Sequence, residues 1–189
     1  MATLQERFAA QVPELRKELG ILAKEKGNNK IADVTVKQAY GGMRGIKGMI
    51  CDTSVVEPDK GLIIREHPLL TLKELWPEEI FYLLVTGEKP TKEETAALQL
   101  DLAARSHIPD YVWDILEAMP PDSHPMCMLN TAILAMEKES AFRAWYDKGM
   151  TKSEYWIPMM EDSLRILGVL PGIAAGVYRI RYGKGEPID

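Results

Sequence analysis

The chain has 189 residues, of which 46% are hydrophobic and 27% are charged. These proportions are typical of a soluble globular protein with a substantial core. A formal net charge of −5 argues against general binding to nucleic acid or to anionic membranes, because both require a positive field. No run of 18 apolar residues is present, so the sequence predicts no membrane-spanning helix.

Cysteine and histidine usage predicts neither disulfides nor a metal site. Cys51 and Cys127 lie far apart in apolar surroundings, so we expect both to be buried, reduced thiols. Two cysteines and three histidines form no cluster with the spacing of zinc ligands. The first residues lack the apolar stretch of a signal peptide. A cytoplasmic protein is the simplest expectation.

Apolar residues at helical spacing predict a first helix from about Leu4 to Lys26. Pro13 should kink or restart this helix, since proline suits a first turn and removes an amide donor. The following Gly27-Asn28-Asn29 should end it. The apolar stripe consists of Leu4, Phe8, Val12, Leu15, Leu19 and Leu22.

The stretch from Tyr40 to Glu66 predicts a single β-hairpin in an otherwise helical chain. Two β-prone runs, Met49–Val56 and Leu62–Arg65, flank a turn that ends at Gly61, where a left-handed conformation is expected. No repeat, low-complexity segment or linker interrupts the rest of the sequence. We therefore expect one all-α domain with one small hairpin.

A glycine-rich approach to the hairpin surrounds Arg44 and Lys47. Glycine permits positive φ and close approach of a ligand, and exposed amides with a guanidinium suit phosphate oxygens. The pattern matches neither a P-loop nor a dinucleotide fingerprint. From the residues alone, a structural tight turn is the favoured alternative. The glycines are Gly41, Gly42, Gly45 and Gly48.

Several helices with clear start signals should follow the hairpin. Capping boxes are predicted at Thr71–Glu74, Thr91–Glu94 and Thr151–Glu154. The expected helices are Pro77–Thr86, Lys92–Arg105, a short one from Pro109-Asp110 through Met119, Pro125–Met136, a mixed segment Glu137–Lys148, and a long one from Lys152 to about Tyr182.

The long final helix should extend for about 45 Å at 1.5 Å per residue. Lys152 would lie at its N-terminus, where the dipole and the side chain both favour an anion, although a solvated surface lysine is the simpler alternative. Pro171 and Gly172 should bend the helix. Gly172 and Gly176, one turn apart, should permit close packing of another helix.

The segment Pro125–Met136 is apolar on all sides, and such a helix must be buried in a large core or in an interface. A chain of this size has limited capacity to surround it, so we favour an interface that includes Met128. The three histidines, His67, His107 and His124, lie near prolines at element ends. Capping or packing is therefore a better prediction for them than acid–base catalysis.

Several motifs resemble a known family in order and spacing. Met43-Arg44-Gly45-Ile46-Lys47-Gly48, followed by Thr53-Ser54-Val55 and Pro58-Asp59-Lys60-Gly61, resembles the N-terminal hairpin of citrate synthases of the mitochondrial type. The resemblance continues almost to the end of the chain through Glu78–Gly87, His124-Pro125-Met126, Tyr155-Trp156, Glu161-Asp162 and Val177-Tyr178-Arg179. It departs at Glu66-His67-Pro68, where relatives often continue differently.

The resemblance implies that residues 1–189 form the N-terminal part of a helical large domain. Citrate synthases are homodimers that condense acetyl-CoA with oxaloacetate, using two histidines and an aspartate, with arginines that hold oxaloacetate. Those residues lie in the later part of the family's longer chains, so the small domain and the catalytic segments are expected to be absent. We expect a C-terminal partner chain, whether this chain is a natural subunit or an expressed fragment. A mature mitochondrial matrix form is also compatible with the sequence.

The family's contacts to coenzyme A, a substrate component and not a covalently bound cofactor, imply two site residues. Arg44 matches an arginine that reaches across the dimer, and Lys152 matches a basic residue just ahead of a Tyr-Trp pair. A lysine there makes a bidentate phosphate grip less secure than arginine would. The family's dimerisation helices correspond to Tyr111–Met119 and Pro125–Met136. The alternative from another class is a non-catalytic interaction module that retains this scaffold.

Overall fold

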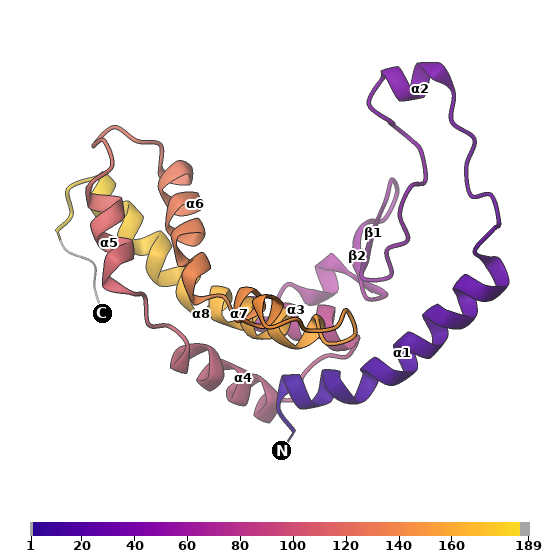
Figure 1. Cartoon of the computed structure of the whole chain (residues 1–189), viewed down its shortest axis with the longest axis horizontal. Helices are drawn as coiled ribbons and strands as arrows, with labels where there is room; N and C mark the ends of the chain where they lie inside the picture. Colours follow the sequence, from indigo (N-terminus) through magenta and orange to yellow (C-terminus); the bar gives the residue numbers. More distant parts are fainter. Residues whose placement is uncertain (1, 186–189) are drawn as a thin grey trace. The chain divides into compact units, whose positions relative to one another are not determined.

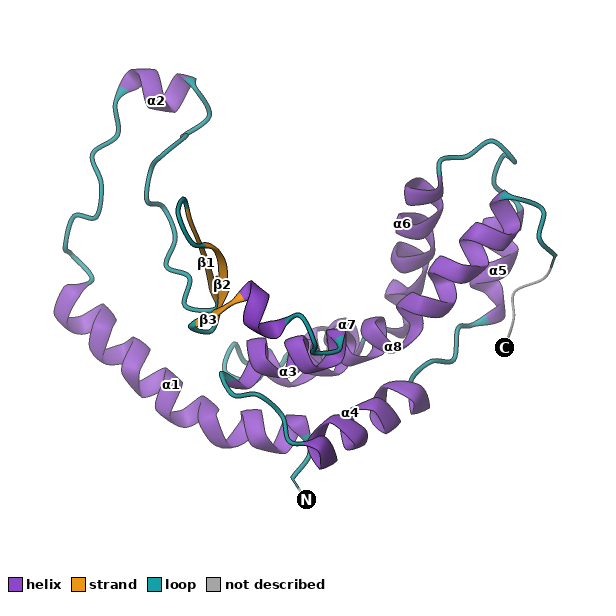
Figure 2. Ribbon diagram, turned by 180° about the vertical axis from the view of Figure 1, so that it is seen from behind, coloured by secondary structure: helices purple, strands orange, loops and turns teal. Residues whose placement is uncertain are grey.

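Helices dominate the computed structural model, which describes residues 2–185 (Figures 1 and 2). Two units, Met1–Ala96 and Ala97–Asp189, each have their own internal packing. The boundary falls inside helix α4 (Lys92–Ala104), so no linker separates the units. The expected class, helical with a small β element, is confirmed.

Helix α1 (Leu4–Lys26) has the bounds expected from its sequence. Thr3 closes its N-terminus with a capping box, in which the Thr3 amide donates to Glu6 Oε2 at 2.8 Å and Thr3 Oγ1 accepts from the Glu6 amide at 3.2 Å. At the other end the Gly27 amide donates to the carbonyl of Ala23 at 3.1 Å. The helix runs through Pro13 without interruption, so the expected restart does not occur.

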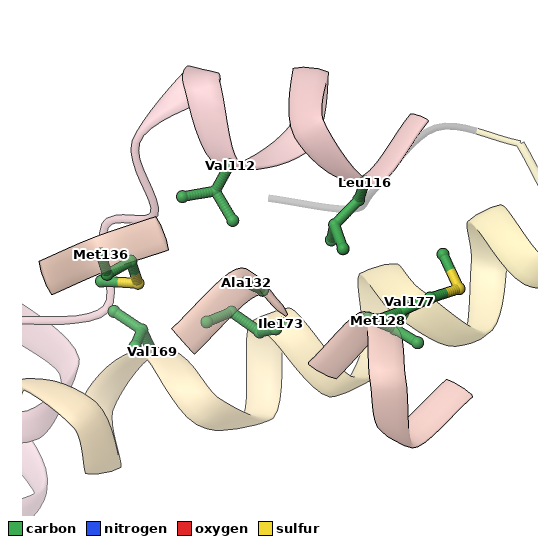
Figure 3. Packing of buried hydrophobic residues seen from close by; sticks show 8 residues of the cluster. All are labelled: Val112, Leu116, Met128, Ala132, Met136, Val169, Ile173 and Val177. Carbon is green, nitrogen blue, oxygen red and sulfur yellow. The ribbon is translucent and has the colours of Figure 1, made fainter. Parts of the chain in front are cut away.

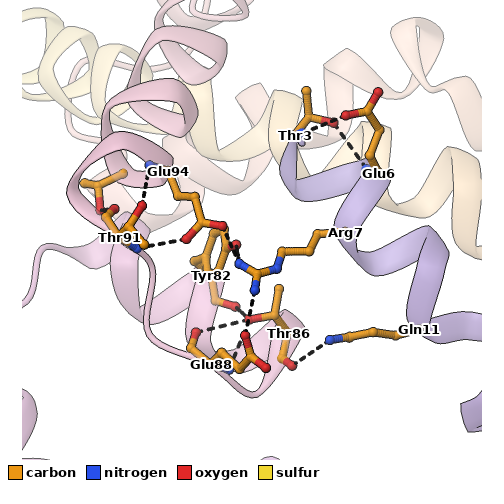
Figure 4. Close-up of polar contacts among 10 residues, drawn as sticks. Thr3, Glu6, Arg7, Gln11, Tyr82, Thr86, Glu88, Thr91 and Glu94 are labelled. Carbon is orange, nitrogen blue, oxygen red and sulfur yellow. Dashed lines mark hydrogen bonds and ion pairs between the residues drawn. The ribbon is translucent and has the colours of Figure 1, made fainter. Parts of the chain in front are cut away.

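Polar contacts hold the first turns of α1 against α3 (Pro77–Thr86) and the start of α4, as Figure 4 shows. Arg7 Nη1 donates to Tyr82 Oη at 3.0 Å, and the same guanidinium forms ion pairs with Glu94 and Glu88. Gln11 Nε2 donates to the carbonyl of Thr86 at 3.1 Å. Burial of the ring raises the pKa of Tyr82, which keeps its hydroxyl protonated within this cluster.

The hairpin consists of β1 (Ser54–Glu57) and β2 (Gly61–Ile64), paired antiparallel with Ser54 opposite Ile64. Gly61 has the expected left-handed conformation, with φ of 74°. β1 begins at Ser54 and not at Met49, so the first strand is shorter than predicted.

A third strand, β3 (His67–Pro68), pairs with β2 and was not expected from the sequence. Arg65 and Glu66 reverse the chain with φ of 43° and 69°. Tight hairpin turns with two positive φ values normally use asparagine, aspartate or glycine, so this pair carried no recognisable turn signal.

The short α2 (Val36–Tyr40) precedes the hairpin and is capped by Thr35.

Ile64, Leu72 and Leu83 form the small core of the first unit, beneath β2, α3 and the 3₁₀ helix η1 (Leu69–Leu72). The predicted capping box at Thr71 is wrong, because Thr71 lies inside η1 and donates its hydroxyl to the carbonyl of Pro68 at 2.7 Å. The box at Thr91 is confirmed by reciprocal bonds with Glu94 of 2.8 Å and 3.2 Å.

The second unit is built on α5 (Asp110–Glu117), α6 (Pro125–Ala135) and α8 (Trp156–Arg181). The 3₁₀ helix η2 (Met136–Glu139) and α7 (Ala141–Asp147) connect α6 to α8. Figure 3 shows the core between the three longer helices, formed by Val112, Leu116, Met128, Ala132, Met136, Val169, Ile173 and Val177.

Small residues on α8 allow the close packing that the sequence predicted. A Cβ atom added to Gly176 would lie 2.3 Å from Cζ3 of Trp113, and one added to Gly172 would lie 2.8 Å from Cδ1 of Ile108. Each of these distances is shorter than real Cβ contacts, so α8 packs directly against Trp113 of α5 at Gly176 and against Ile108 of the preceding loop at Gly172.

Helix α8 begins at Trp156, four residues later than predicted, and residues 152–155 form turns. Thr151 makes half of the expected capping box, because its amide donates to Glu154 Oε2 at 2.9 Å while the Glu154 amide donates to the Thr151 carbonyl. Among the described residues, α8 is the one helix long and apolar enough to cross a membrane by composition. Its apolar residues Val169, Ile173 and Val177 lie in the core of the second unit.

Candidate functional site

The glycine-rich segment before the hairpin adopts a tight turn in which three of four successive residues have positive φ. Gly42, Met43 and Gly45 have φ of 77°, 62° and 75°. The Met43 amide donates to the carbonyl of Gln38 at 2.8 Å, which ties the turn to the end of α2. Glycine at two of these positions avoids the steric cost of a left-handed backbone, as the sequence predicted.

Arg44 lies in the middle of this turn with an exposed side chain. Within residues 2–185 no hydrogen bond or ion pair to its guanidinium is present. Met43 takes a positive φ beside it although it is not a glycine, and such a conformation costs about 1 kcal/mol or more. The turn therefore exposes the Arg44 guanidinium without a hydrogen-bond partner among the described residues, on a backbone with unusual φ values.

Lys152 is exposed in the turn that precedes α8. The prediction that it stands at the N-terminus of the long helix is wrong, because the helix begins at Trp156. Glu154, which is hydrogen-bonded to the hydroxyl of Thr151 at 2.7 Å, has a lowered pKa and stays ionised in the same turn. An anion near Lys152 would therefore gain less from the helix dipole than the sequence suggested.

Arg44 belongs to the first unit and Lys152 to the second. Both remain exposed cations that are available to an anionic ligand.

The three histidines occupy a helix cap, a loop and a short strand. His124 is the N-cap of α6, and its Nδ1 accepts from the Met126 amide at 3.1 Å, which confirms capping. His107 is exposed in the loop before α5, and His67 is half-buried in β3. Across the part of the chain that the structure describes, no three His, Cys, Asp or Glu side chains form a group that could hold a metal ion.

Both cysteines are exposed, so the prediction of buried thiols is wrong. Cys51 lies in the loop before β1, where the apolar neighbours in sequence do not fold over it, and Cys127 lies on a face of α6 that points away from the core. Hydrogen bonding by the Thr53 hydroxyl, 3.3 Å from Cys51 Sγ, and by the backbone of Ser54 and Thr53 lowers the pKa of the Cys51 thiol to about 7.

The apolar helix α6 divides into a buried and an exposed face. Met128 and Ala132 are 2% and 0% exposed in the core, whereas Met126 and Leu134 are 55% and 74% exposed. Met128 therefore packs inside its own unit and is not a surface residue. The uncovered apolar face, and not the whole helix, is the part available for an interface.

Asp162 of α8, which the sequence offered only as part of a motif, adds to the N-cap Ser140 at the start of α7. Its carboxylate accepts from the Ser140 hydroxyl at 2.6 Å and from the amides of Ala141 and Phe142 at 2.7 Å and 3.1 Å. Its neighbour Glu161 forms an ion pair with Arg105. The acidic pair thus has structural partners, and the bonds that Asp162 adds to this helix start leave no local sequence signal because they come from a distant helix.

A cavity of about 140 Å³ lies beside this cap, between α6, η2 and α8. It is smaller than the roughly 300–1,000 Å³ of typical small-molecule sites, so it does not fit a ligand as large as coenzyme A. Its lining residues are Ile133, Met136, Glu137, Glu139, Ser140, Asp162, Arg165 and Ile166.

Comparison with known proteins gives a consistent result for nearly the whole chain. A family model described as "Citrate synthase, C-terminal domain" matches residues 42–189, a range that includes both Arg44 and Lys152. The mitochondrial citrate synthase of Saccharomyces cerevisiae is 42% identical over 97% of this chain and 40% of the relative. The mitochondrial 2-methylcitrate synthase of Yarrowia lipolytica is 42% identical over 97% of this chain and 42% of the relative.

A peroxisomal citrate synthase of Saccharomyces cerevisiae is 40% identical over 97% of this chain and 42% of its own length. The chain thus spans about two fifths of the length of the curated relatives it matches. Their names place those proteins in mitochondria or a peroxisome, and the cytoplasmic location expected from composition receives no support from them. The matched family model and the identity across almost the whole sequence show that this chain belongs to the citrate synthase family.

Proposed function

We propose that this chain is the N-terminal part of a citrate synthase and takes part in condensing acetyl-CoA with oxaloacetate only within a larger assembly. The observation that supports this most directly is the combination of 42% identity over 97% of the chain with coverage of 40% of the relative. A chain that matches its relative over nearly its whole length while spanning two fifths of that relative is expected to supply one portion of the enzyme.

We infer that the chemistry requires groups from outside this portion of the enzyme. Removing a proton from the methyl group of acetyl-CoA needs a positioned base and a donor for the developing enolate oxygen. In residues 2–185, His124 is engaged as a helix cap, His107 is exposed in a loop, and His67 is half-buried in β3. We infer that the base, the donor and the arginines that hold oxaloacetate come from the remainder of the enzyme.

The contribution of this chain would be binding and assembly. Arg44, exposed on a constrained turn, and Lys152, exposed in the turn before α8, are proposed to contact the phosphates of coenzyme A. Guanidinium and ammonium groups bind phosphate oxygens through charge-assisted hydrogen bonds. The apolar surface of Tyr111–Met119 and Pro125–Met136 is proposed to form a two-fold contact between copies.

The proposed contacts of Arg44 and Lys152 do not determine which acyl group the enzyme transfers. The relatives include a citrate synthase and a 2-methylcitrate synthase of equal identity to this chain. Their products differ by one methyl group, whereas contacts to coenzyme phosphates are the same for both acyl donors. Both propionyl-CoA and acetyl-CoA should therefore be tested as substrates.

The test follows release of free thiol from acetyl-CoA, and in parallel from propionyl-CoA, in the presence of oxaloacetate. The purified chain is measured alone and after co-expression with the part of the Saccharomyces cerevisiae mitochondrial citrate synthase that this chain does not match. We expect no turnover from the chain alone and oxaloacetate-dependent turnover from the pair. Turnover by the chain alone would show that the catalytic residues lie within it.

The second candidate is a non-catalytic interaction module. It is favoured by the exposed apolar face of α6, which includes Leu134 and Met126. A folded chain that self-associates but never binds or activates the remainder in the same experiment would support this alternative over the enzyme portion.

A further inference from the structure

One apolar stripe runs along α1, and only its first half is covered. Leu4 is 5% exposed and Phe8 is half-buried, while Leu15, Leu19 and Leu22 are 41%, 64% and 41% exposed. At 3.6 residues per turn, these five positions lie on the same face of the helix.

The covered half is held by its own unit. Arg7 donates to the hydroxyl of Tyr82, and Gln11 donates to the carbonyl of Thr86, both on α3. Beyond this point every residue from Pro13 to Lys26 is exposed, a length of about 21 Å. In Figures 1 and 2 this half of α1 runs away from α3.

An uncovered helix of this kind lacks its usual source of stability. A helix of this length is marginal in water without packing along its apolar face, and contiguous exposed leucines indicate an interaction surface. The segment that follows is equally uncovered, because no residue between Leu4 and Ile64 is fully buried. Its exposed apolar side chains include Ile31, Val34, Val36 and Tyr40.

We propose that the stripe Leu15, Leu19 and Leu22 is the surface on which a helix from the remainder of the citrate synthase chain docks. This inference rests on the function proposed above. The relatives have about 1.5 times the length of this chain outside the match, since it covers 40% of the relative, so the natural occupant is the rest of that chain.

The helix that docks on this stripe should have an apolar face, and its flanking residues need not all carry the same sign of charge. Glu14 and Glu18 flank the stripe together with Arg16 and Lys17, so the surrounding charges are mixed. Three leucines provide much less than the roughly 800 Å² per partner that a stable dimer buries. A second copy held by this stripe alone would therefore bind weakly, whereas the remainder of the chain makes further contacts elsewhere.

The experiment measures binding of the chain to the unmatched part of the Saccharomyces cerevisiae mitochondrial citrate synthase, co-expressed with an affinity tag. The test variant is Leu19→Ser with Leu22→Ser. The matched control is Ile21→Ser, because Ile21 is 47% exposed on the same helix but lies about a third of a turn away from the stripe. Circular dichroism checks that both variants remain folded.

We expect the double variant to weaken binding by about tenfold or more, since two leucines lose their apolar contact, and the control to bind as the unmodified chain does. Hydrogen exchange should show that the amides of residues 16–26 become protected only when the remainder is bound.

Equal binding by the double variant and the unmodified chain would overturn the docking surface while leaving the proposed function intact. Protection of α1 by self-association, without the remainder, would overturn it in favour of a second copy. Failure of the unmodified chain to bind the remainder would overturn both proposals.

Discussion

At the scale of single residues, the turn around Arg44 illustrates how backbone conformation prepares a side chain. Gly42 and Gly45 adopt positive φ at little cost, and Met43 adopts it at a steric cost. The amide of Met43 donates to the carbonyl of Gln38, which ties the turn to the end of α2. This arrangement holds the base of the Arg44 side chain while its guanidinium remains exposed.

We predict that Arg44→Ala weakens binding of acyl-CoA in the complete assembly by about 1.5–3 kcal/mol, the range for hydrogen bonds to charged groups. Oxaloacetate affinity should remain nearly the same, because that ligand is expected to bind elsewhere. Titration calorimetry with each ligand, on the chain co-expressed with the remainder, measures both effects.

Lys47→Ala is the matched control for this prediction. Lys47 is exposed in the same glycine-rich segment and carries the same charge, so it tests whether any nearby cation would suffice. Equal losses of affinity in the two variants would indicate a general electrostatic effect in place of a specific contact by Arg44.

At the scale of elements, glycines on α8 and α1 have opposite roles. Gly176 faces Trp113 so closely that any side chain must displace the indole, whereas a Cβ added to Gly20 of α1 would meet no atom within 4 Å beyond the neighbouring backbone of its own helix. The same substitution to alanine should therefore have opposite consequences in the two helices.

Gly176→Ala should lower the free energy of unfolding by about 1–3 kcal/mol, the usual cost of overpacking a core. Gly20→Ala should be neutral or stabilising by up to about 1 kcal/mol, because alanine is the better helix former. Urea unfolding followed by circular dichroism compares the two variants. A Gly176→Ala chain as stable as the unmodified one would contradict the close contact with Trp113.

Helix α6 allows a second comparison between its two faces. Leu134→Glu should leave the fold intact and abolish self-association, because Leu134 is 74% exposed on the proposed interface. Met128→Glu should instead unfold the second unit, since it places a charge in a core position that is 2% exposed, at a cost of several kcal/mol. Sedimentation velocity and circular dichroism separate these outcomes. A chain that is monomeric at micromolar concentration before any substitution would refute the interface.

At the scale of the whole molecule, the two units differ in how their cores are built. The first has a small core around Leu83, and the second has a larger core around Ile173 that draws on α5, α6 and α8. Because this larger core contains no residue from the first unit, the second unit should hold together without it.

We predict that a piece comprising residues 92–185 folds on its own and unfolds cooperatively on heating. Within it, Ile173→Ala should cost about 2–5 kcal/mol, because the side chain is fully buried in the core. Leu100→Ala is the matched control, as Leu100 is 73% exposed on α4 and should have little effect. Thermal unfolding monitored by circular dichroism measures all three chains. A piece without a cooperative transition would show that the second core depends on the first unit.

Local interactions explain what could be predicted from the sequence. The bounds of Leu4–Lys26 and Pro77–Thr86 were predicted correctly, because apolar periodicity, an N-terminal proline and a terminal glycine are local signals that act within a few turns. The family was recognisable for a similar reason, since its motifs are short and their order survives in the chain. The assignment of Arg44 and Lys152 to coenzyme A came from that resemblance and stays a prediction.

Other features depended on contacts between residues far apart in sequence, and only the tertiary structure decided them. Asp162 bonds to the start of α7 because α8 passes beside it, and Met128 became a core residue because α5 and α8 cover that face of α6. Cys51 was left exposed because its apolar neighbours in sequence do not pack over it. Sequence periodicity shows that a face is apolar, but which neighbour covers it is determined by the packing of distant segments.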